Sequence, residues 1–454
     1  MLINFRVENF LSFDQVSTFS MTTGKTKLHQ KNIIKTKDID LLKFAAVYGA
    51  NASGKSNFVT AISFSQIMIL NGIKEEIVSN LYNRNKKDNS KRKTRFEYEL
   101  KINDKIYSYG FSMDMIENKF SEEWLYDITE DEKLIFTRGP GLEINFDYLN
   151  FDESSENRLK VYADDTISND AQLFITALNK DKNKIISKDG DSIFTSLFEW
   201  FRDVLEVISP DEATSDFAMT YKNEKYLNKL SNYLKLNDTG INRVLLEKTD
   251  GRIKGMPIEL EKKIREKILS DMLKNEDSAK RHGVMVRTSE NIYTFELSNS
   301  ELQMFEIKFE HGDSKIKYSL NEESDGTVRL IELFSVLFSK KEKVFIIDEL
   351  DRSLHPLLTY NFVQSFLDKE ENSQLIVTTH EDRLLDLSLL RRDEIWFVKK
   401  DNDGDSQLYS LEEFKERFDK NIMNAYLDGR YGGTPKIRNL FSMLQEDEAT
   451  DEEN

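Results

Sequence analysis

Residues 49–56 of the chain are Gly49-Ala50-Asn51-Ala52-Ser53-Gly54-Lys55-Ser56, a glycine-rich loop of the Walker A pattern. The mostly apolar residues 41–48 before the loop predict a buried strand, and residues 57–62 after it predict the opening of a helix. In such a loop the backbone N–H groups converge on phosphates, Lys55 reaches the β- and γ-phosphates, and Ser56 can bind Mg²⁺. An ordinary glycine-rich turn can match the pattern by chance, but seldom between a strand and a helix. The expected nucleotide contacts are Gly49, Asn51, Ser53, Gly54, Lys55, Ser56 and Asn57.

A second segment, residues 344–349, is an apolar stretch that ends in Asp348 and Glu349. This is the form of a Walker B strand, in which the aspartate lies beside Mg²⁺ and the next acid orients the attacking water. A core strand that runs into an acidic loop would look the same in isolation. A further apolar strand, residues 374–379, follows and ends at His380. The order of these elements strengthens the prediction of nucleotide binding.

Residues 321–327, Asn-Glu-Glu-Ser-Asp-Gly-Thr, form a polar loop before an amphipathic helix that we expect over residues 328–337. Ser324 and Gly326 at the start of such a helix can form an anion-binding N-terminus. Ser-Asp-Gly is also ordinary turn and capping chemistry. From these residues alone, both interpretations stay open.

Together these motifs resemble ABC-type ATPases, which have a Walker A loop, a Ser-x-Gly signature, a Walker B strand, a D-loop and a switch histidine in this order. The chain is most similar to the SMC/RecF-like branch, and within it to bacterial AAA-type ATP-binding proteins related to OLD and abortive-infection ATPases. Similar segments are residues 3–13 with their Asn-Phe-x-Ser-Phe ending, and residues 348–356, 391–397 and 426–435. The resemblance covers residues 1–130 and 300–440 approximately.

The resemblance implies an α/β fold of the ABC/SMC-type P-loop ATPase head, with an N-terminal β-rich lobe, a parallel-sheet core and a helical insertion. It also implies a composite ATP site in a homodimer or a higher homo-oligomer. Glu349 and His380 would be catalytic, Ser56 and Asp348 would hold Mg²⁺, and Ser324 with Gly326 would cover the γ-phosphate from the second subunit.

Two features depart from the family pattern. The signature is Glu323-Ser324-Asp325-Gly326-Thr327 instead of the transporter-like Leu-Ser-Gly-Gly-Gln, so only the serine and the second glycine are carried over. A Q-loop glutamine cannot be placed, because Gln66 falls in the helix after the P-loop and Gln172 has no clear strand before it.

Size and composition limit the classes of protein to consider. The 454 residues suggest about two or three domain-sized units, and the hydrophobic content of 39% supports a substantial core. The absence of cysteine excludes disulfides and thiolate metal sites, and the five scattered histidines argue against a zinc site. With neither a membrane-length apolar run nor a signal-peptide pattern, we expect a soluble cytoplasmic protein.

The net charge of −17 disfavours a protein covered in nucleic-acid-binding surface, although a local patch can still bind DNA or RNA. The candidate patch is a basic segment that contains Arg84, Lys86, Lys87, Lys91, Arg92, Lys93 and Arg95. Such a segment is more often a solvated loop. Residues 441–454 are strongly acidic, and we expect them to form a disordered, solubilising tail.

The pattern along the chain predicts three domains. These are residues 1–149, an ATPase lobe with Walker A; residues 150–290, a helical insertion; and residues 291–440, a lobe with the signature loop, Walker B, D-loop and switch histidine. Helices are expected over residues 170–179, 192–208, 221–236 and 257–274, without the sustained heptads of a coiled-coil arm. A hairpin over residues 394–411 has a tip, 401–405, that resembles a calcium loop but lacks its final glutamate.

Three functions compete. The first is an ATPase that acts as a sensor or scaffold in an anti-phage, abortive-infection-type complex, triggered by a phage protein and controlling a separately encoded nuclease or toxin effector. It rests on the resemblance and on the short stretch after His380, which is too small for the TOPRIM nuclease domain of OLD-like enzymes. The second is a RecF/SMC-like ATP-dependent DNA-binding protein of DNA repair. A transporter ATPase subunit is disfavoured by the altered signature and the insertion.

Overall fold

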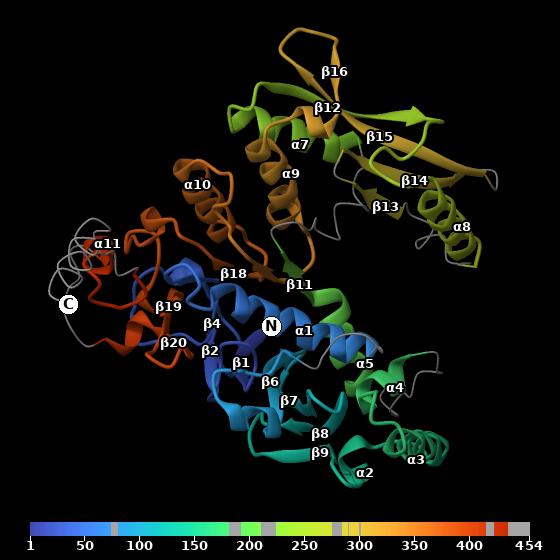
Figure 1. Cartoon of the computed structure of the whole chain (residues 1–454), viewed down its shortest axis with the longest axis vertical. Helices are drawn as coiled ribbons and strands as arrows, with labels where there is room; N and C mark the ends of the chain where they lie inside the picture. Colours follow the sequence, from blue (N-terminus) through green and yellow to red (C-terminus); the bar gives the residue numbers. More distant parts are fainter. Residues whose placement is uncertain are drawn as a thin grey trace, which may run out of the picture. The chain divides into compact units, whose positions relative to one another are not determined.

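The computed structural model describes residues 1–73, 80–180, 192–209, 224–274, 284–288, 290–298, 301–414 and 422–434. The chain divides into two compact units, one formed by Met1–Arg202 with Thr378–Asn454 and the other by Asp203–Val377 (Figure 1). The acidic segment 441–454, expected to be a disordered tail, lies outside the described residues.

The first unit contains a seven-stranded antiparallel sheet in the order β10-β9-β8-β7-β6-β1-β2. Its strands are β1 (Leu2–Glu8), β2 (Ser17–Ser20), β6 (Thr94–Ile102), β7 (Lys105–Asp114), β8 (Lys119–Asp127), β9 (Lys133–Arg138) and β10 (Leu142–Ile144). The alternation of apolar and polar residues gives the sheet one buried face. Helix α1 (Lys55–Asn71) covers that face, and the ring of Phe58 lies 6.0 Å from that of Phe5 (Figure 1).

The same unit contains the strand that leads into the Walker A loop. This strand, β5 (Phe44–Tyr48), is buried along its whole length and pairs in parallel with β19 (Ile395–Lys400). Strand β20 (Ser406–Ser410) pairs antiparallel with β19, and the short strands β3 (Ile33–Ile34) and β4 (Leu41–Leu42) form a separate pair. Since parallel strands end at the same edge, the C-terminal ends of β5 and β19 place residues 49–56 next to residues 399–401.

The other α-helices described in the first unit are α2 (Phe146–Leu149), α3 (Glu153–Ile167), α4 (Phe174–Asn179), α5 (Ile193–Glu199) and α11 (Ile422–Leu427). A π-helical turn at Trp200–Val204 follows α5. Buried Glu123 holds the start of α4, because its carboxylate accepts hydrogen bonds from the N–H groups of Phe174 (2.6 Å) and Ile175 (3.2 Å). Burial raises the pKa of Glu123, although these bonds oppose the rise.

The second unit has parallel and antiparallel strands. Strand β17 (Val344–Ile347) pairs in parallel with β11 (Leu205–Ile208) on one side and β18 (Gln374–Thr378) on the other. An antiparallel sheet has the order β12-β15-β14-β13, with β16 on β15. Its strands are β12 (Ile241–Thr249), β13 (Val284–Arg287), β14 (Ile292–Ser298), β15 (Glu301–His311) and β16 (Lys317–Tyr318). Among its described residues, the α-helices are α7 (Glu224–Leu236), α8 (Ile258–Lys274), α9 (Asp325–Phe338) and α10 (Pro356–Leu367).

The predicted α/β class is confirmed, with an N-terminal β-rich lobe and parallel strands in each unit. The predicted helix over residues 192–208 is wrong at its end, where residues 205–208 form β11, and the strands β12 and β13 were not predicted. Residues 205–208 continue a helical pattern locally, but their pairing with β17 decides their conformation, as tertiary contacts commonly override local propensity. As functional domains, the ranges 1–149, 150–290 and 291–440 stay a prediction. In the part of the chain that the structure describes, no helix has the length and apolarity needed to span a membrane.

Candidate nucleotide-binding site

The Walker A loop leaves the buried strand β5 and enters α1 through a residue that must be glycine. Gly54 caps α1 with φ 113°, and a Cβ at this position would lie 2.2 Å from the Ser406 hydroxyl oxygen. A side chain at Gly49 would likewise lie 2.5 Å from the Ser53 hydroxyl oxygen. A side chain at either position would overlap neighbouring atoms, so only glycine fits at these two positions.

Lys55 is the buried cation of the loop. Its ammonium group donates hydrogen bonds to the carbonyl oxygens of Gly49 (2.8 Å) and Ala50 (3.2 Å), so the side chain curls back over the loop from which it starts. The buried Ser53 hydroxyl has no hydrogen-bond partner among the described residues. A cation held at the loop, an orphaned hydroxyl and a glycine-lined bend fit a triphosphate chain.

A group of polar side chains fastens the loop to two segments far away in the sequence. Asn57 donates a hydrogen bond of 2.7 Å to the Ser12 hydroxyl. The Ser406 hydroxyl lies 2.7 Å from that of Ser12 and 2.6 Å from the Ser53 carbonyl oxygen. Ser12 belongs to the Asn-Phe-x-Ser-Phe segment, which the structure thus places against the loop. Ser406 was not predicted, because nothing in its local sequence marks it.

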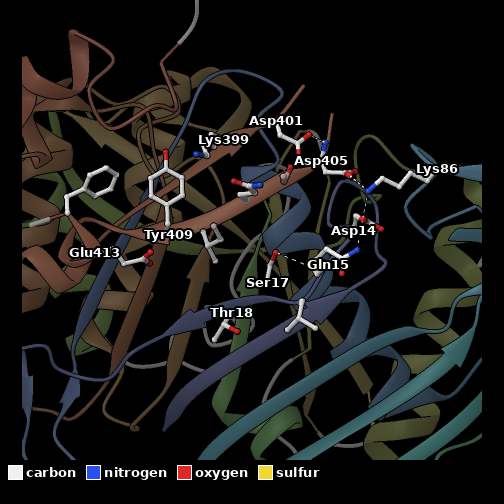
Figure 2. A pocket seen from close by; sticks show the side chains of 15 residues that line it. Asp14, Gln15, Ser17, Thr18, Lys86, Lys399, Asp401, Asp405, Tyr409 and Glu413 are labelled. Carbon is white, nitrogen blue, oxygen red and sulfur yellow. Dashed lines mark hydrogen bonds and ion pairs between the residues drawn. The ribbon is translucent and has the colours of Figure 1, made fainter. Parts of the chain in front are cut away.

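The basic segment proposed as a nucleic-acid contact is largely neutralised. Lys86 pairs with Asp14 (2.6 Å) and Asp405 (3.2 Å), and Arg92 pairs with Asp14 and Glu8. Three further ion pairs are Lys91–Asp88, Lys93–Glu122 and Arg95–Glu97. Figure 2 shows Lys86 between the two aspartates, at one end of a cavity of about 790 Å³. Because acids offset these cations, the segment attracts nucleic acid less than its composition suggests.

Asp14 is the centre of this polar cluster. Burial raises its pKa, but hydrogen bonds from Lys86, Gln15, Arg92 and Asn89 outweigh burial and hold the pKa well below its ordinary value. The hairpin tip at residues 401–405 joins the same cluster through Asp405. Its Asp401 carboxylate accepts hydrogen bonds from the N–H groups of Asp403 and Asp405, which is turn chemistry. No group of three or more metal-ligating side chains occurs in the described part of the chain.

His380 lies in the same unit as the Walker A loop. The N–H of Thr379 donates to the carbonyl oxygen of Val47 in β5 at 3.2 Å, which anchors the chain directly before the exposed His380. The predicted switch histidine thus follows a residue that is fastened to the loop's own strand.

The predicted Walker B residues belong to the second unit. Asp348 is 7% exposed, directly after β17, and Glu349 has φ 50°, a conformation that costs a non-glycine residue on the order of 1–3 kcal/mol. The buried guanidinium of Arg329 donates to the carbonyl oxygens of Asp348 (3.3 Å) and Glu349 (3.0 Å). Arg329 also pairs with Glu332 at 3.2 Å. Arg329 therefore stabilises the strained backbone at Glu349, the predicted catalytic acid. The sequence pattern did not predict this role of Arg329.

The predicted signature residues begin α9 in this second unit. Ser324 is the N-cap, and its hydroxyl accepts a hydrogen bond of 3.2 Å from the N–H of Thr327. A Cβ at Gly326 would lie 2.8 Å from the carbonyl oxygen of Ser353, which belongs to the D-loop-like segment. The structure thus brings Ser324, Gly326, Asp348 and Glu349 together in one unit, and residues 49–57 with His380 in the other. Each unit is described here by itself.

Residues 391–397, which are similar to a segment of the family, connect the C-terminal part of the first unit to residues near its N-terminus. Arg391 is fully buried, pairs with Asp393 at 2.6 Å and donates to the Leu28 carbonyl oxygen at 2.7 Å. The Glu394 carboxylate accepts hydrogen bonds from the Asn32 amide (2.9 Å) and from the backbone N–H of Arg391 (2.6 Å). Burial raises the pKa of Glu394 to about 8 despite these two bonds.

Comparison with known proteins gives one family match. The family described as "AAA domain, putative AbiEii toxin, Type IV TA system" matches residues 44–386. No curated protein matches the chain.

Among solved structures, an SMC head bound to the C-winged helix domain of ScpA has 15% identity and a TM-score of 0.39, over 90% of this chain and 97% of that one. The SMC head domain from Thermotoga maritima has 14% identity and a TM-score of 0.34, over 90% and 98%. A Pyrococcus furiosus SMC head with an extended coiled coil, bound to the C-terminal domain of ScpA, has 14% identity and a TM-score of 0.35, over 95% and 98%.

Proposed function

The chain belongs to the AAA-domain family of the AbiEii-toxin, type IV toxin–antitoxin kind, and from this premise we propose that it binds and hydrolyses ATP. The observation that supports the proposal best is the Walker A loop, with its buried Lys55, orphaned Ser53 hydroxyl and obligatory Gly54. This combination suits a phosphate chain and has no evident use in an ordinary turn.

Each predicted residue has a role in this proposal. Lys55 binds the β- and γ-phosphates, and Ser56 and Asp348 are the ligands for Mg²⁺, which would neutralise charge on the phosphates. Glu349 orients the attacking water, and His380 contacts the γ-phosphate from the same subunit. Ser324 and Gly326 contact the γ-phosphate from a second subunit, so hydrolysis requires a homodimer or a larger assembly.

We further propose that the chain is the ATPase subunit of an anti-phage, abortive-infection-type complex. It would control a separate nuclease or toxin effector through ATP-dependent oligomerisation, in response to a phage protein. The family's description as a toxin–antitoxin AAA domain supports this role. The alternative, a RecF-like DNA-repair ATPase, gains less support, because acids balance most of the basic segment near residues 84–95.

Two measurements test the ATPase proposal. Isothermal titration with ATP and Mg²⁺ should show binding to the wild-type chain and none to folded Lys55→Ala, which lacks the phosphate-facing charge. Phosphate release by the wild type should depend on protein concentration if a second subunit completes the site. Wild-type affinity in Lys55→Ala would overturn the assignment of the loop.

The biological role needs a separate experiment. The chain should be purified from its native operon with the neighbouring gene products, and the complex's mass measured with and without ATP. Copurification of a nuclease-like or toxin-like protein supports the defence role. Copurification of recombination proteins supports the repair role instead.

A further inference from the structure

A glycine-rich turn at residues 428–434 packs against the Walker A loop, although about 380 residues separate the two in the sequence. This segment, which we name the glycine turn, follows α11 and lies outside the residues that the family model matches. Gly429, Gly432 and Gly433 all have positive φ, at 75°, 67° and 75°. Such a run is unfavourable for other residues, so the backbone path of the turn depends on glycine.

At Gly433 the backbone of the turn comes close to the backbone of the loop. A Cβ built on Gly433 would lie 3.4 Å from the carbonyl oxygen of Val398 and 3.5 Å from the Cα of Gly49. Gly49 is the first residue of the Walker A loop, and Val398 lies in the neighbouring strand β19. Gly433 therefore lies between the start of the loop and β19, where even a Cβ would be in van der Waals contact with both.

Aromatic residues fasten the glycine turn to the strands that flank the loop. The ring of Phe397 in β19 stacks on Tyr426 at 5.5 Å and 21° and on Tyr431 at 5.4 Å and 18°. Tyr48, the residue before Gly49, packs edge-on against Tyr426 at 5.8 Å. Tyr426 and Tyr431 are 6% and 5% exposed, so this contact is part of the core.

Two hydroxyl groups hold the turn's own carbonyls. Tyr426 donates a hydrogen bond of 3.3 Å to the carbonyl oxygen of Gly433, and Tyr409 donates to that of Tyr431. Figure 2 shows Tyr409 beside Lys399 at one end of the pocket, with the Lys399 ammonium 5.2 Å from the ring centre. The backbone of the glycine turn is thereby held at two carbonyl groups, those of Tyr431 and Gly433.

The same Gly49 is also held from inside the loop. Lys55 donates its ammonium hydrogens to the carbonyl oxygens of Gly49 and Ala50, so a displacement of Gly49 moves the position in which Lys55 rests. Between the outer face of residues 50–53, the end of β19 and the glycine turn lies a cavity of about 850 Å³. The glycine turn and the Walker A loop thus line the same cavity.

From these contacts we propose that the glycine turn is a positioning element of the ATP site. It holds Gly49 in place, so that the loop keeps the curvature in which Lys55 meets the β- and γ-phosphates. This inference rests on the proposed ATP-binding function. In this proposal, residues that do not contact the phosphates contribute to the affinity for the nucleotide.

The test compares two glycines of the same turn. Gly433→Asn introduces a side chain whose Cβ would contact Gly49 and Val398 at ordinary van der Waals distance, 3.5 and 3.4 Å. Gly429→Asn introduces the same side chain away from the Walker A loop, where its Cβ would lie 3.2 Å from the Thr434 hydroxyl oxygen. The control position is therefore at least as crowded as the test position, but its crowding does not involve the loop. Both positions have φ 75°, and asparagine tolerates positive φ better than most residues, so the backbone strain is matched. Affinity for a non-hydrolysable ATP analogue with Mg²⁺ is measured by titration, and thermal stability is measured without nucleotide.

We expect Gly433→Asn to weaken nucleotide binding by about tenfold to hundredfold, as small displacements of binding groups do, while Gly429→Asn stays close to wild type. The two variants should have similar melting temperatures without nucleotide. Equal affinities of the two folded variants would overturn the inference. If the wild type itself fails to bind the analogue, the proposed function fails first, which distinguishes the two outcomes.

A second variant keeps the test decisive if Gly433→Asn does not fold. Tyr426→Phe removes only the hydroxyl that donates to Gly433 and leaves the aromatic stack in place. It should weaken nucleotide binding by about threefold, the scale of one lost hydrogen bond, with the fold intact. Unchanged affinity in folded Tyr426→Phe would count against the proposed role.

Discussion

Removing the Arg329 guanidinium should separate the stability of the second unit from its catalytic competence. Arg329 is 4% exposed in α9 and has two kinds of partner. It pairs with Glu332 at 3.2 Å, and it donates to the backbone carbonyl oxygens of Asp348 and Glu349. The variant Arg329→Met keeps a chain of similar length without charge or donors.

The expected cost follows from burial. Breaking a buried ion pair by removing one partner typically costs about 3–5 kcal/mol, because the other charge stays buried without its counter-charge. For a unit of this size, such a loss lowers the melting temperature by about 10 °C. The carbonyl oxygens of Asp348 and Glu349 also lose their Arg329 donors, and the positive φ of Glu349 is no longer held. Turnover should therefore fall by about tenfold to hundredfold.

The double variant Arg329→Met/Glu332→Met distinguishes the two effects. Replacing both partners of a buried pair by apolar residues is often neutral or stabilising, so the melting temperature should recover most of its loss. The carbonyl contacts stay absent, so kcat should stay low in both variants, measured by phosphate release at saturating ATP. ATP affinity should be little changed, since residues 49–57 provide most of it. A double variant with wild-type kcat would refute the idea that Arg329 positions Glu349.

Three further predictions concern the catalytic acid, the composite site and a buried carboxyl. Glu349→Gln should bind ATP with near-wild-type affinity but hydrolyse it on the order of a hundredfold more slowly, and ATP-bound oligomers should accumulate; wild-type turnover would exclude Glu349 as the catalytic acid. Ser324→Arg and Lys55→Ala should each be inactive, whereas mixing them should restore part of the ATPase activity through one intact interface; no recovery despite verified subunit exchange would argue against a site shared in trans. Burial raises the pKa of Glu394 from 4.5 to about 8, so between pH 5 and 8 its carboxyl group is protonated in the folded state and ionised in the unfolded chain. The folded state of the wild type therefore loses stability as the pH rises through this window. Neutral Glu394→Gln should avoid that loss and gain on the order of 2–4 kcal/mol relative to wild type by pH 8, as urea titrations can show; an unchanged difference would mean that Glu394 ionises normally.

The elements that the sequence predicted well are those whose signals are local. The buried run before Gly49, the acid pair after β17 and the hairpin of β19 and β20 each show their pattern within a few residues. Strand β11 was missed because its four residues are decided by pairing with β17, more than 130 residues later. The basic segment near residue 86 looked like a charged patch because three of the acids that balance it, Asp14, Glu122 and Asp405, come from other parts of the chain.

The same reasoning explains why the supporting residues of the site escaped sequence analysis while its motif residues did not. A motif residue such as Lys55 can be recognised from its neighbours in the sequence. Ser406, Arg329 and Gly433 cannot, because their contacts are with residues that are distant in the sequence and meet them only after folding. The Walker A loop is held by the hydrogen-bonded pair Ser12 and Ser406 near Ser53 and Asn57, and by the glycine turn at Gly49. In the proposed function, nucleotide affinity depends on the fraction of molecules in which the loop is correctly held, so we expect these distant segments and ATP to stabilise one another. The support of the Walker A loop therefore extends beyond the eight residues of the motif to distant segments of the first unit.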